Sequence, residues 1–97
     1  MGTTTLDSFD QSVAPGAIWE LAVTNATSTD MRVGWLGAVW DQVDDSTPVI
    51  IPETGTADIG DTSDVSFTVN KSGSTVRLQY TYTGVWTIAG HRRLICR

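Results

Sequence analysis

Residues 65–95, VSFTVNKSGSTVRLQYTYTGVWTIAGHRRLI, predict three consecutive β-strands with short connections between them. The first run, residues 65–69, alternates apolar and polar side chains with the period of two that a half-buried strand shows. Residues 70–73, Asn-Lys-Ser-Gly, favour a turn, because Asn tolerates positive φ and Gly adopts it freely. A second alternating run follows, and Thr83-Gly84 leads into a third. The segment therefore predicts a C-terminal β-meander.

The rest of the chain adds three strand patterns, at residues 17–24, 31–40 and 48–52. Proline closes the last of them at both ends. This restricts it to an edge, or to a corner where the chain switches sheets, because proline donates no hydrogen bond to a neighbouring strand. Gly34 and Gly37 inside the second pattern indicate a bulge or the close approach of another backbone.

Polar loops are expected at residues 41–47 and 53–63, and residues 1–16 form a polar N-terminal arm for which a loop or an edge strand is expected. No segment shows the apolar period of a helix, and Thr, Val and aromatic residues favour strands. About six strands at this spacing in 97 residues predict one all-β domain over residues 17–97. Its expected form is a small antiparallel β-sandwich, jelly-roll-like or immunoglobulin-like.

The net charge of −5 argues against general binding to nucleic acid or to an anionic membrane. The charges are also divided along the chain, because every acidic residue lies at or before Asp64. This division predicts contact between the acidic front and the basic tail, within one fold or between copies. Simple pairing of strands from the two parts is the favoured alternative. The basic residues after Asp64 are Lys71, Arg77, Arg92, Arg93 and Arg97.

Cys96 is the only cysteine, so no intramolecular disulfide can form. The first residues lack the basic and apolar regions of a signal peptide. No apolar run approaches the roughly 20 residues that span a bilayer. We therefore expect a protein that is made and folded in a cytoplasm without a membrane partner.

The sequence offers little for catalysis or metal binding. His91 is the only histidine, and neither a nucleophile motif nor a carboxylate adjacent in sequence marks it as a base. Calcium binds clustered carboxylates, but the aspartates do not follow EF-hand spacing and are ordinary turn residues. We therefore expect neither an enzyme nor a cofactor, with a calcium site as the less favoured alternative. The clustered aspartates are Asp41, Asp44 and Asp45 in one loop and Asp58, Asp61 and Asp64 in the other.

Among the four tryptophans, Trp19 and Trp35 share strand faces with apolar residues and are expected in the core. Trp40 stands beside the acidic loop and is the candidate for an exposed ring. Such a ring would stack on a sugar whose hydroxyls bind the carboxylates, or anchor a protein interface; core packing is the alternative of equal weight. The candidate ligand or interface residues are Trp40, Asp41, Asp44, Asp45, Arg77, Arg92 and Arg93.

The last third of the chain carries the pattern GDTS (60–63), VSFTV (65–69), SG (72–73), VRL (76–78) and WTIAGHRRLI (86–95). It resembles the C-terminal meander of small β-domains in tailed-bacteriophage virion proteins, such as tail, fibre and head-decoration components. Strands of that kind end in a Trp-x-(Val/Ile)-x-Gly-x-Arg run with an apolar finish. The motif is structural, so no catalytic residue is carried over with it.

The resemblance implies a non-enzymatic component of a phage virion, present in repeated copies around a symmetry axis. The expected partners are other copies of the chain, as a trimer, and other virion proteins. Two alternatives stay open. One is a carbohydrate- or receptor-binding module that recognises a host-surface glycan, and the other is a hydrolase in which His91 acts with a carboxylate.

Overall fold

In the computed structural model, which describes residues 2–44 and 46–95, most of the chain is β-strand. One 3-10 turn, η1, follows the first strand. The elements are β1 (Gly2–Asp10), η1 (Gln11–Val13), β2 (Gly16–Asn25), β3 (Met31–Val39), β4 (Val49–Ile59), β5 (Val65–Ser72), β6 (Thr75–Tyr82) and β7 (Trp86–Ile95).

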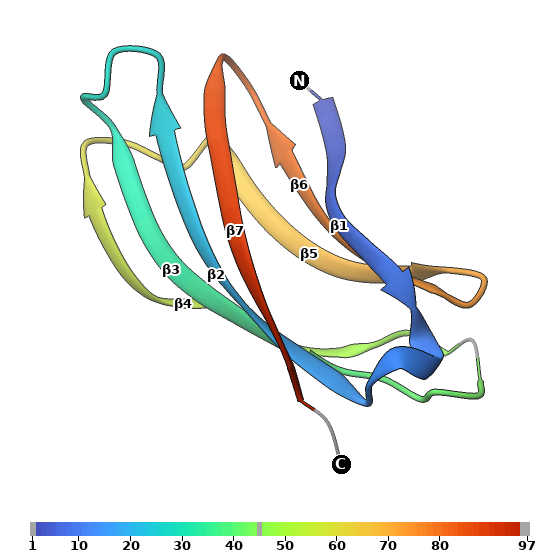
Figure 1. Ribbon diagram of the computed structural model, residues 1–97. Coiled ribbons are helices and arrows are strands. Elements are labelled where there is room, and N and C mark those ends of the chain that lie inside the picture. The colour runs from blue at the N-terminus through green and yellow to red at the C-terminus, as the bar shows by residue number, and fades with distance from the viewer. Residues whose placement is uncertain (1, 45, 96–97) are drawn as a thin grey trace.

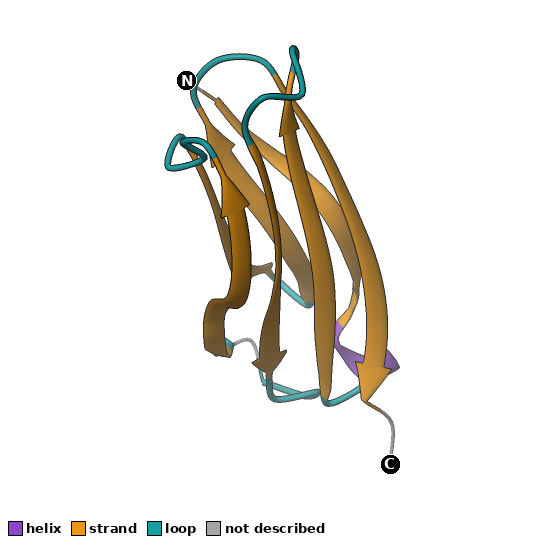
Figure 2. Ribbon diagram, turned by 90° about the vertical axis from the view of Figure 1, so that its left-hand side faces the viewer, coloured by secondary structure: helices purple, strands orange, loops and turns teal. Residues whose placement is uncertain are grey.

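The strands form two sheets, one of three strands in the order β1-β6-β5 and one of four in the order β4-β3-β2-β7 (Figure 1). Every pairing is antiparallel. Turned by 90°, the molecule shows long strands running along its length, with η1 near the C-terminal end of β7 (Figure 2). The prediction of a small all-β antiparallel sandwich is confirmed.

The core lies between the two sheets and is built from alternate side chains of both. Trp19 and Leu36 of the four-stranded sheet are 1% and 0% exposed, and Val76 and Leu78 of the three-stranded sheet are both 0% exposed. Successive side chains of a strand point to opposite faces, so each sheet can bury one set while the other set faces away. The predicted core position of Trp19 is confirmed.

The predicted meander is correct for its first two strands and wrong for its third. β5 and β6 form a hairpin, in which Gly73 adopts φ +58°. β7 leaves that sheet and pairs with β2 of the other one. Gly84, at φ +95°, redirects the chain between them, and the Trp86 indole N–H donates to the Thr83 carbonyl at 2.8 Å.

The four-stranded sheet is closed on one side by β4, which is longer than predicted. Residues 53–59, expected in a loop, continue the strand through Pro52. β4 is an edge strand, so proline is tolerated there, as expected. The expected irregularity around Gly34 and Gly37 is confirmed by two register shifts between β3 and β4. A Cβ on Gly34 would lie 2.8 Å from the Thr56 side chain and 3.2 Å from the Thr54 carbonyl oxygen, so β4 approaches closely there.

The predicted N-terminal arm, residues 1–16, contains β1 and η1. β1 is the edge strand of the three-stranded sheet and pairs with β6 along its length, with one register shift between Thr5 and Asp7. Leu6 and Phe9 pack against the core. Of the two forms expected for this segment, the structure shows the edge strand.

Candidate functional site

β3 turns its more apolar side away from the core. Met31, Val33 and Trp35 alternate with Arg32, Gly34 and Leu36, and either set could have faced inward by period alone. Leu36 is fully buried and Arg32 is only 8% exposed, so the set that contains the arginine faces the second sheet. Val33 is 55% exposed on the other side.

Arg32 is accommodated inside because each nitrogen of its guanidinium group donates a hydrogen bond and the charge is paired with Glu53. Its Nε and Nη2 bind the two carboxylate oxygens of Glu53, each at 3.0 Å. Its Nη1 donates to the carbonyl and hydroxyl oxygens of Thr62 at 2.8 and 3.0 Å, and Nη2 also donates to the Val65 carbonyl at 2.9 Å. A buried charge is tolerated when it is paired and fully hydrogen-bonded. The network joins β3, β4, the 60–64 connection and the start of β5.

The opposite side of the four-stranded sheet, called here the outer face, exposes large aliphatic side chains. Five of them are between 54% and 72% exposed, and Trp35, Ile18 and Met31 are half-buried among them. A monomeric domain seldom leaves such a contiguous apolar surface uncovered, and larger patches mark interaction sites. The five exposed residues are Val33, Val39, Val49, Ile51 and Ile59.

A shallow depression of about 540 Å³ lies on the outer face beside Trp35. Gly55 allows the indole to lie against β4, since it adopts φ +60° and a Cβ there would be 2.7 Å from Trp35 Nε1. The expectation that Trp35 belongs to the core is therefore wrong, because it lies on the outer set of β3. The depression is lined by Glu20, Leu21, Ala22, Val33, Gly34, Trp35, Gly55, Ala89, Gly90 and His91.

The charged groups of the outer face lie on its β2–β7 half. Glu20 is opposite His91 in the β2–β7 register, and Arg93 is opposite Ile18. The carboxylate that a catalytic His91 would need thus lies on a neighbouring strand. The residues that line the depression, all in the described part of the chain, include no Ser, Thr, Cys or Lys to act as a nucleophile.

Trp40 is not available to a ligand, so the expectation of an exposed ring is wrong. It is 7% exposed and packs 5.5 Å, centroid to centroid, from the Phe9 ring. Its indole N–H donates to the Gln11 carbonyl at 3.1 Å. The residue lies five positions after Trp35 and so belongs to the opposite, inward set of the strand pattern.

The acidic loop beside it, residues 41–47, is organised by its own backbone. Asp41 accepts the N–H groups of Asp44 and Val43 at 3.0 and 2.8 Å, and these bonds hold its pKa below the ordinary value. Lys71 donates to the carbonyls of Asp41 and Asp44 at 2.8 and 2.6 Å. Asp45 lies outside the described residues. The predicted sugar site at this loop loses its aromatic platform, because Trp40 is buried.

The second aspartate series is likewise engaged with its neighbours. Asp58 accepts from the Thr62 hydroxyl at 2.9 Å, and Asp61 accepts from the Ser63 hydroxyl at 2.7 Å, which lowers the pKa of Asp61. Across residues 2–44 and 46–95, no group of three or more His, Cys, Asp and Glu side chains is placed to hold a metal ion.

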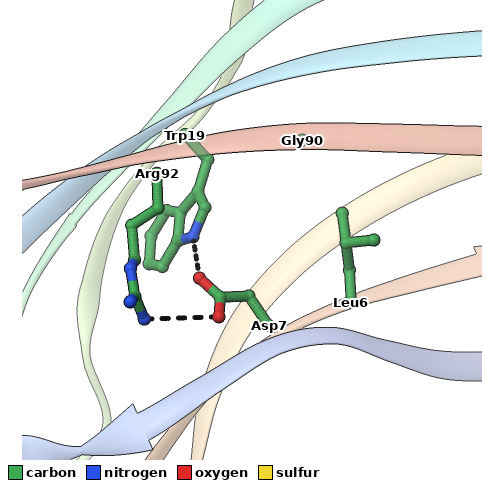
Figure 3. A pocket seen from close by; sticks show the side chains of 5 residues that line it. All are labelled: Leu6, Asp7, Trp19, Gly90 and Arg92. Carbon is green, nitrogen blue, oxygen red and sulfur yellow. Dashed lines mark hydrogen bonds and ion pairs between the residues drawn. The ribbon is translucent and has the colours of Figure 1, made fainter.

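A second cavity, of about 240 Å³, opens between β1 and β7 (Figure 3). Asp7 lies at its centre, accepting from Trp19 Nε1 at 2.9 Å and pairing with Arg92 Nη1 at 3.3 Å. Arg92 also stacks 4.7 Å from the centroid of the Phe9 ring. Asp7 binds both Trp19 and Arg92, so this cluster ties the edge strands of the two sheets together. Leu6 and Gly90 complete its lining.

The predicted contact between the acidic front and the basic tail forms within one fold, because Arg92 of β7 pairs with Asp7 of β1 at 3.3 Å. Strands of the two parts also pair, β1 with β6 and β2 with β7, as the favoured alternative predicted. Arg77 instead donates to Asn70 on the neighbouring strand at 2.9 Å. Arg93 lies on the outer face. Sequence reasoning missed Arg32 and Glu53, which are 21 positions apart and gave no local signal. It also missed the outer face, whose signal was the apolar set of β3.

No helix in the described part of the chain is long and apolar enough to cross a membrane. No protein-family model and no characterised protein sequence matches the chain. Among solved structures, the tailspike protein of Acinetobacter baumannii phage AM24 is similar, with 12% identity and a TM-score of 0.48. The likeness covers 94% of this chain and 22% of the tailspike. Values this low carry no argument about function.

Proposed function

We propose that this chain is a non-enzymatic structural component of a phage virion, in the tail, a fibre or the head decoration, and that it works through protein–protein contacts. The observation that carries the assembly role is the exposed apolar outer face. The virion setting comes from the sequence pattern of residues 60–95, which resembles small virion β-domains.

The composition of the outer face suits a protein interface. Interface centres are enriched in aromatic and aliphatic side chains and depleted of charge, with polar groups towards the rim. Here Trp35 stands among valines and isoleucines on β3 and β4, while Glu20, His91 and Arg93 lie on the β2–β7 half. Burying a fully exposed valine or isoleucine is worth roughly 1.5–3 kcal/mol, so leaving five of them largely exposed forgoes stability that a partner would restore.

Carbohydrate or receptor binding is the second candidate, and the depression beside Trp35 favours it. An indole with a carboxylate and an imidazole around a shallow hollow can stack on a sugar ring and bind its hydroxyls. This site replaces the one predicted at Trp40. A host-surface glycan would be its ligand.

The virion assignment is tested on particles purified by density gradient from a lysate of the host that produces the chain. Peptides of this chain should co-purify with capsid and tail proteins at a fixed ratio across the particle peak. Sequencing of the flanking genes should show portal, capsid or tail proteins. Absence of the chain from intact particles, with non-structural neighbours, would overturn the assignment.

Binding to glycans is tested separately on a glycan array and by tryptophan fluorescence. If the second candidate is correct, a sugar should shift the emission of the wild type, and Trp35→Ala should remove the response. A blank array and an unchanged spectrum would eliminate it.

A further inference from the structure

We infer that the outer face of the four-stranded sheet is where copies of this chain meet, so that the side chains on it are covered by a second copy. This inference rests on the proposed assembly function and names the partner. It is carried by the charge distribution and by the area of the face.

The outer face carries one acidic and one fully basic side chain, whereas the whole chain has a large excess of acidic residues. Among the described outward positions of its four strands, the acidic and basic side chains are one carboxylate, Glu20, and one guanidinium, Arg93, with the imidazole of His91 beside them. The whole chain carries −5. Two copies therefore repel each other through most of their surface but not through this face. A strongly basic partner would instead be drawn to the acidic remainder.

The two charges are also arranged for self-pairing. Glu20 lies opposite His91, and Arg93 is two residues further along β7. Neither Glu20 nor Arg93 forms a salt bridge or side-chain hydrogen bond with any residue that the structure describes. Two copies packed face to face can pair Glu20 of each with Arg93 of the other, while their apolar β3–β4 halves cover one another. A face with both signs is complementary to itself.

The area is sufficient for such a contact. Four strands about 4.8 Å apart, each with roughly nine residues rising about 3.3 Å, cover roughly 600 Å². Two such faces bury about 1,200 Å², which reaches the lower end of specific protein–protein interfaces. Small residues at the centre, Ala22, Gly55 and Ala89, leave room for a second sheet to approach.

The first test measures mass in solution by size-exclusion chromatography with light scattering. The wild type should elute at twice its 10.5 kDa mass, because a self-complementary face pairs two copies. Val33→Lys, on the outer face, should weaken association at least about tenfold, since a lysine would be desolvated at the centre of the contact. Val43→Lys has the same charge change at an 88% exposed loop position and should leave association unchanged. Circular dichroism should show both variants folded.

The second test exchanges charges between copies. Glu20→Arg and Arg93→Glu should each weaken self-association, because each puts like charges opposite one another. An equimolar mixture of the two variants should associate again, since the arginine introduced in one copy then faces the glutamate introduced in the other. This recovery cannot come from a folding defect.

Three results would overturn the inference: a monomeric wild type at high concentration, an oligomer that survives Val33→Lys, or a mixture that fails to associate. A monomer that nevertheless co-purifies with particles would leave the virion assignment standing and point to another virion protein as the cover. A monomer whose fluorescence responds to a sugar would point to glycan binding. An oligomer that is absent from particles would retain the interface and remove the virion assignment.

Discussion

The two faces of the four-stranded sheet reverse the usual arrangement, because a charged residue faces the core and large apolar residues face solvent. On β3 the inward set includes a charged residue, Arg32, and the outward set includes Val33, Trp35 and Val39. The inward charge is matched by Glu53 and by three oxygens of the 62–65 segment. The outward apolar residues have no cover in the described chain. The comparison shows that hydrogen-bond satisfaction decides whether a charge can be inside, and that an unmatched apolar face points to a partner.

The largest expected effect comes from breaking the inward network. Arg32→Met should cost about 3–5 kcal/mol of unfolding free energy, because the partly buried Glu53 carboxylate and the Thr62 and Val65 carbonyls lose their donor. Urea unfolding followed by tryptophan fluorescence measures the change. Arg32→Met with Glu53→Leu should recover part of the loss.

The matched control for that change is Arg93→Met, the same substitution on the outer face of the same sheet. In dilute protein, where copies are separate, it should change stability by less than about 0.5 kcal/mol. Equal losses for the two arginines would contradict the distinction between the faces.

Truncating one apolar residue on each face should give the next largest difference. Leu36→Ala, at a fully buried position, should cost about 2–5 kcal/mol through lost burial and the cavity it leaves. Val39→Ala, at a 57% exposed position three residues later, should cost well under about 1 kcal/mol in dilute protein. Thermal and urea unfolding of the two variants, measured side by side, give the difference in their loss of stability. A large loss for Val39→Ala would mean that the outer face is already covered within one chain.

A smaller effect is expected where the outer face depends on glycine. Gly55→Ala should cost about 1–3 kcal/mol, because alanine is strained at φ +60° and its Cβ would meet the Trp35 indole. The emission of Trp35 should shift as the ring moves. Gly73→Ala has nearly the same φ, +58°, and no neighbouring atom within 4 Å, so it should show the backbone strain alone. Identical losses, without a spectral shift in Gly55→Ala, would contradict the contact between the added methyl group and the Trp35 indole.

The smallest effect concerns the acidic loop, which belongs to neither face. The folded-state pKa of Asp41 is lowered by the N–H groups of Asp44 and Val43, so its ionised form stabilises the fold. That contribution is complete above the unfolded pKa of about 3.9 and is lost as the pH falls through the folded value. Asp41→Asn should therefore lower stability slightly near neutral pH and flatten its decline in acid.

Urea midpoints measured across an acid pH series follow this decline. Asp61→Asn should behave in the same way, since the hydroxyl and N–H of Ser63 lower the pKa of Asp61. Parallel pH profiles for wild type and Asp41→Asn would refute the role of the loop bonds.

The two tryptophans of the second predicted strand show how far the candidate site could be anticipated. Trp35 and Trp40 are five positions apart, so the sequence placed them on opposite sides of one strand. It did not say which side was inside, and the apolar neighbours of Trp35 suggested the wrong answer. The set of β3 side chains that contains Arg32 could be buried because Glu53 and Thr62 bind its guanidinium group. Both residues are distant from Arg32 in the sequence and become its neighbours only in the folded protein, where β4 and the 60–64 connection lie beside it.

The third strand of the predicted meander shows the same limit for topology. Local pattern located β7 and gave its alternation, and Gly84 marked a turn before it. Sequence alternation does not record which strand supplies the partner hydrogen bonds. β7 pairs with β2, whose residues lie far earlier in the chain, and this pairing places His91 beside Glu20 and Arg93 on the outer face.

The sequence by itself determined that the chain is all-β, where most of its strands and turns lie, and which residues share a side of each strand. These properties follow from the period of two and from the local preferences of glycine, proline and β-branched residues. Only the tertiary structure decided which side of β3 is buried, which sheet β7 joins, and that the four-stranded sheet has an uncovered apolar face. Those outcomes depend on long-range partners, since alternation defines two sides of a strand and only packing against the rest of the chain distinguishes them.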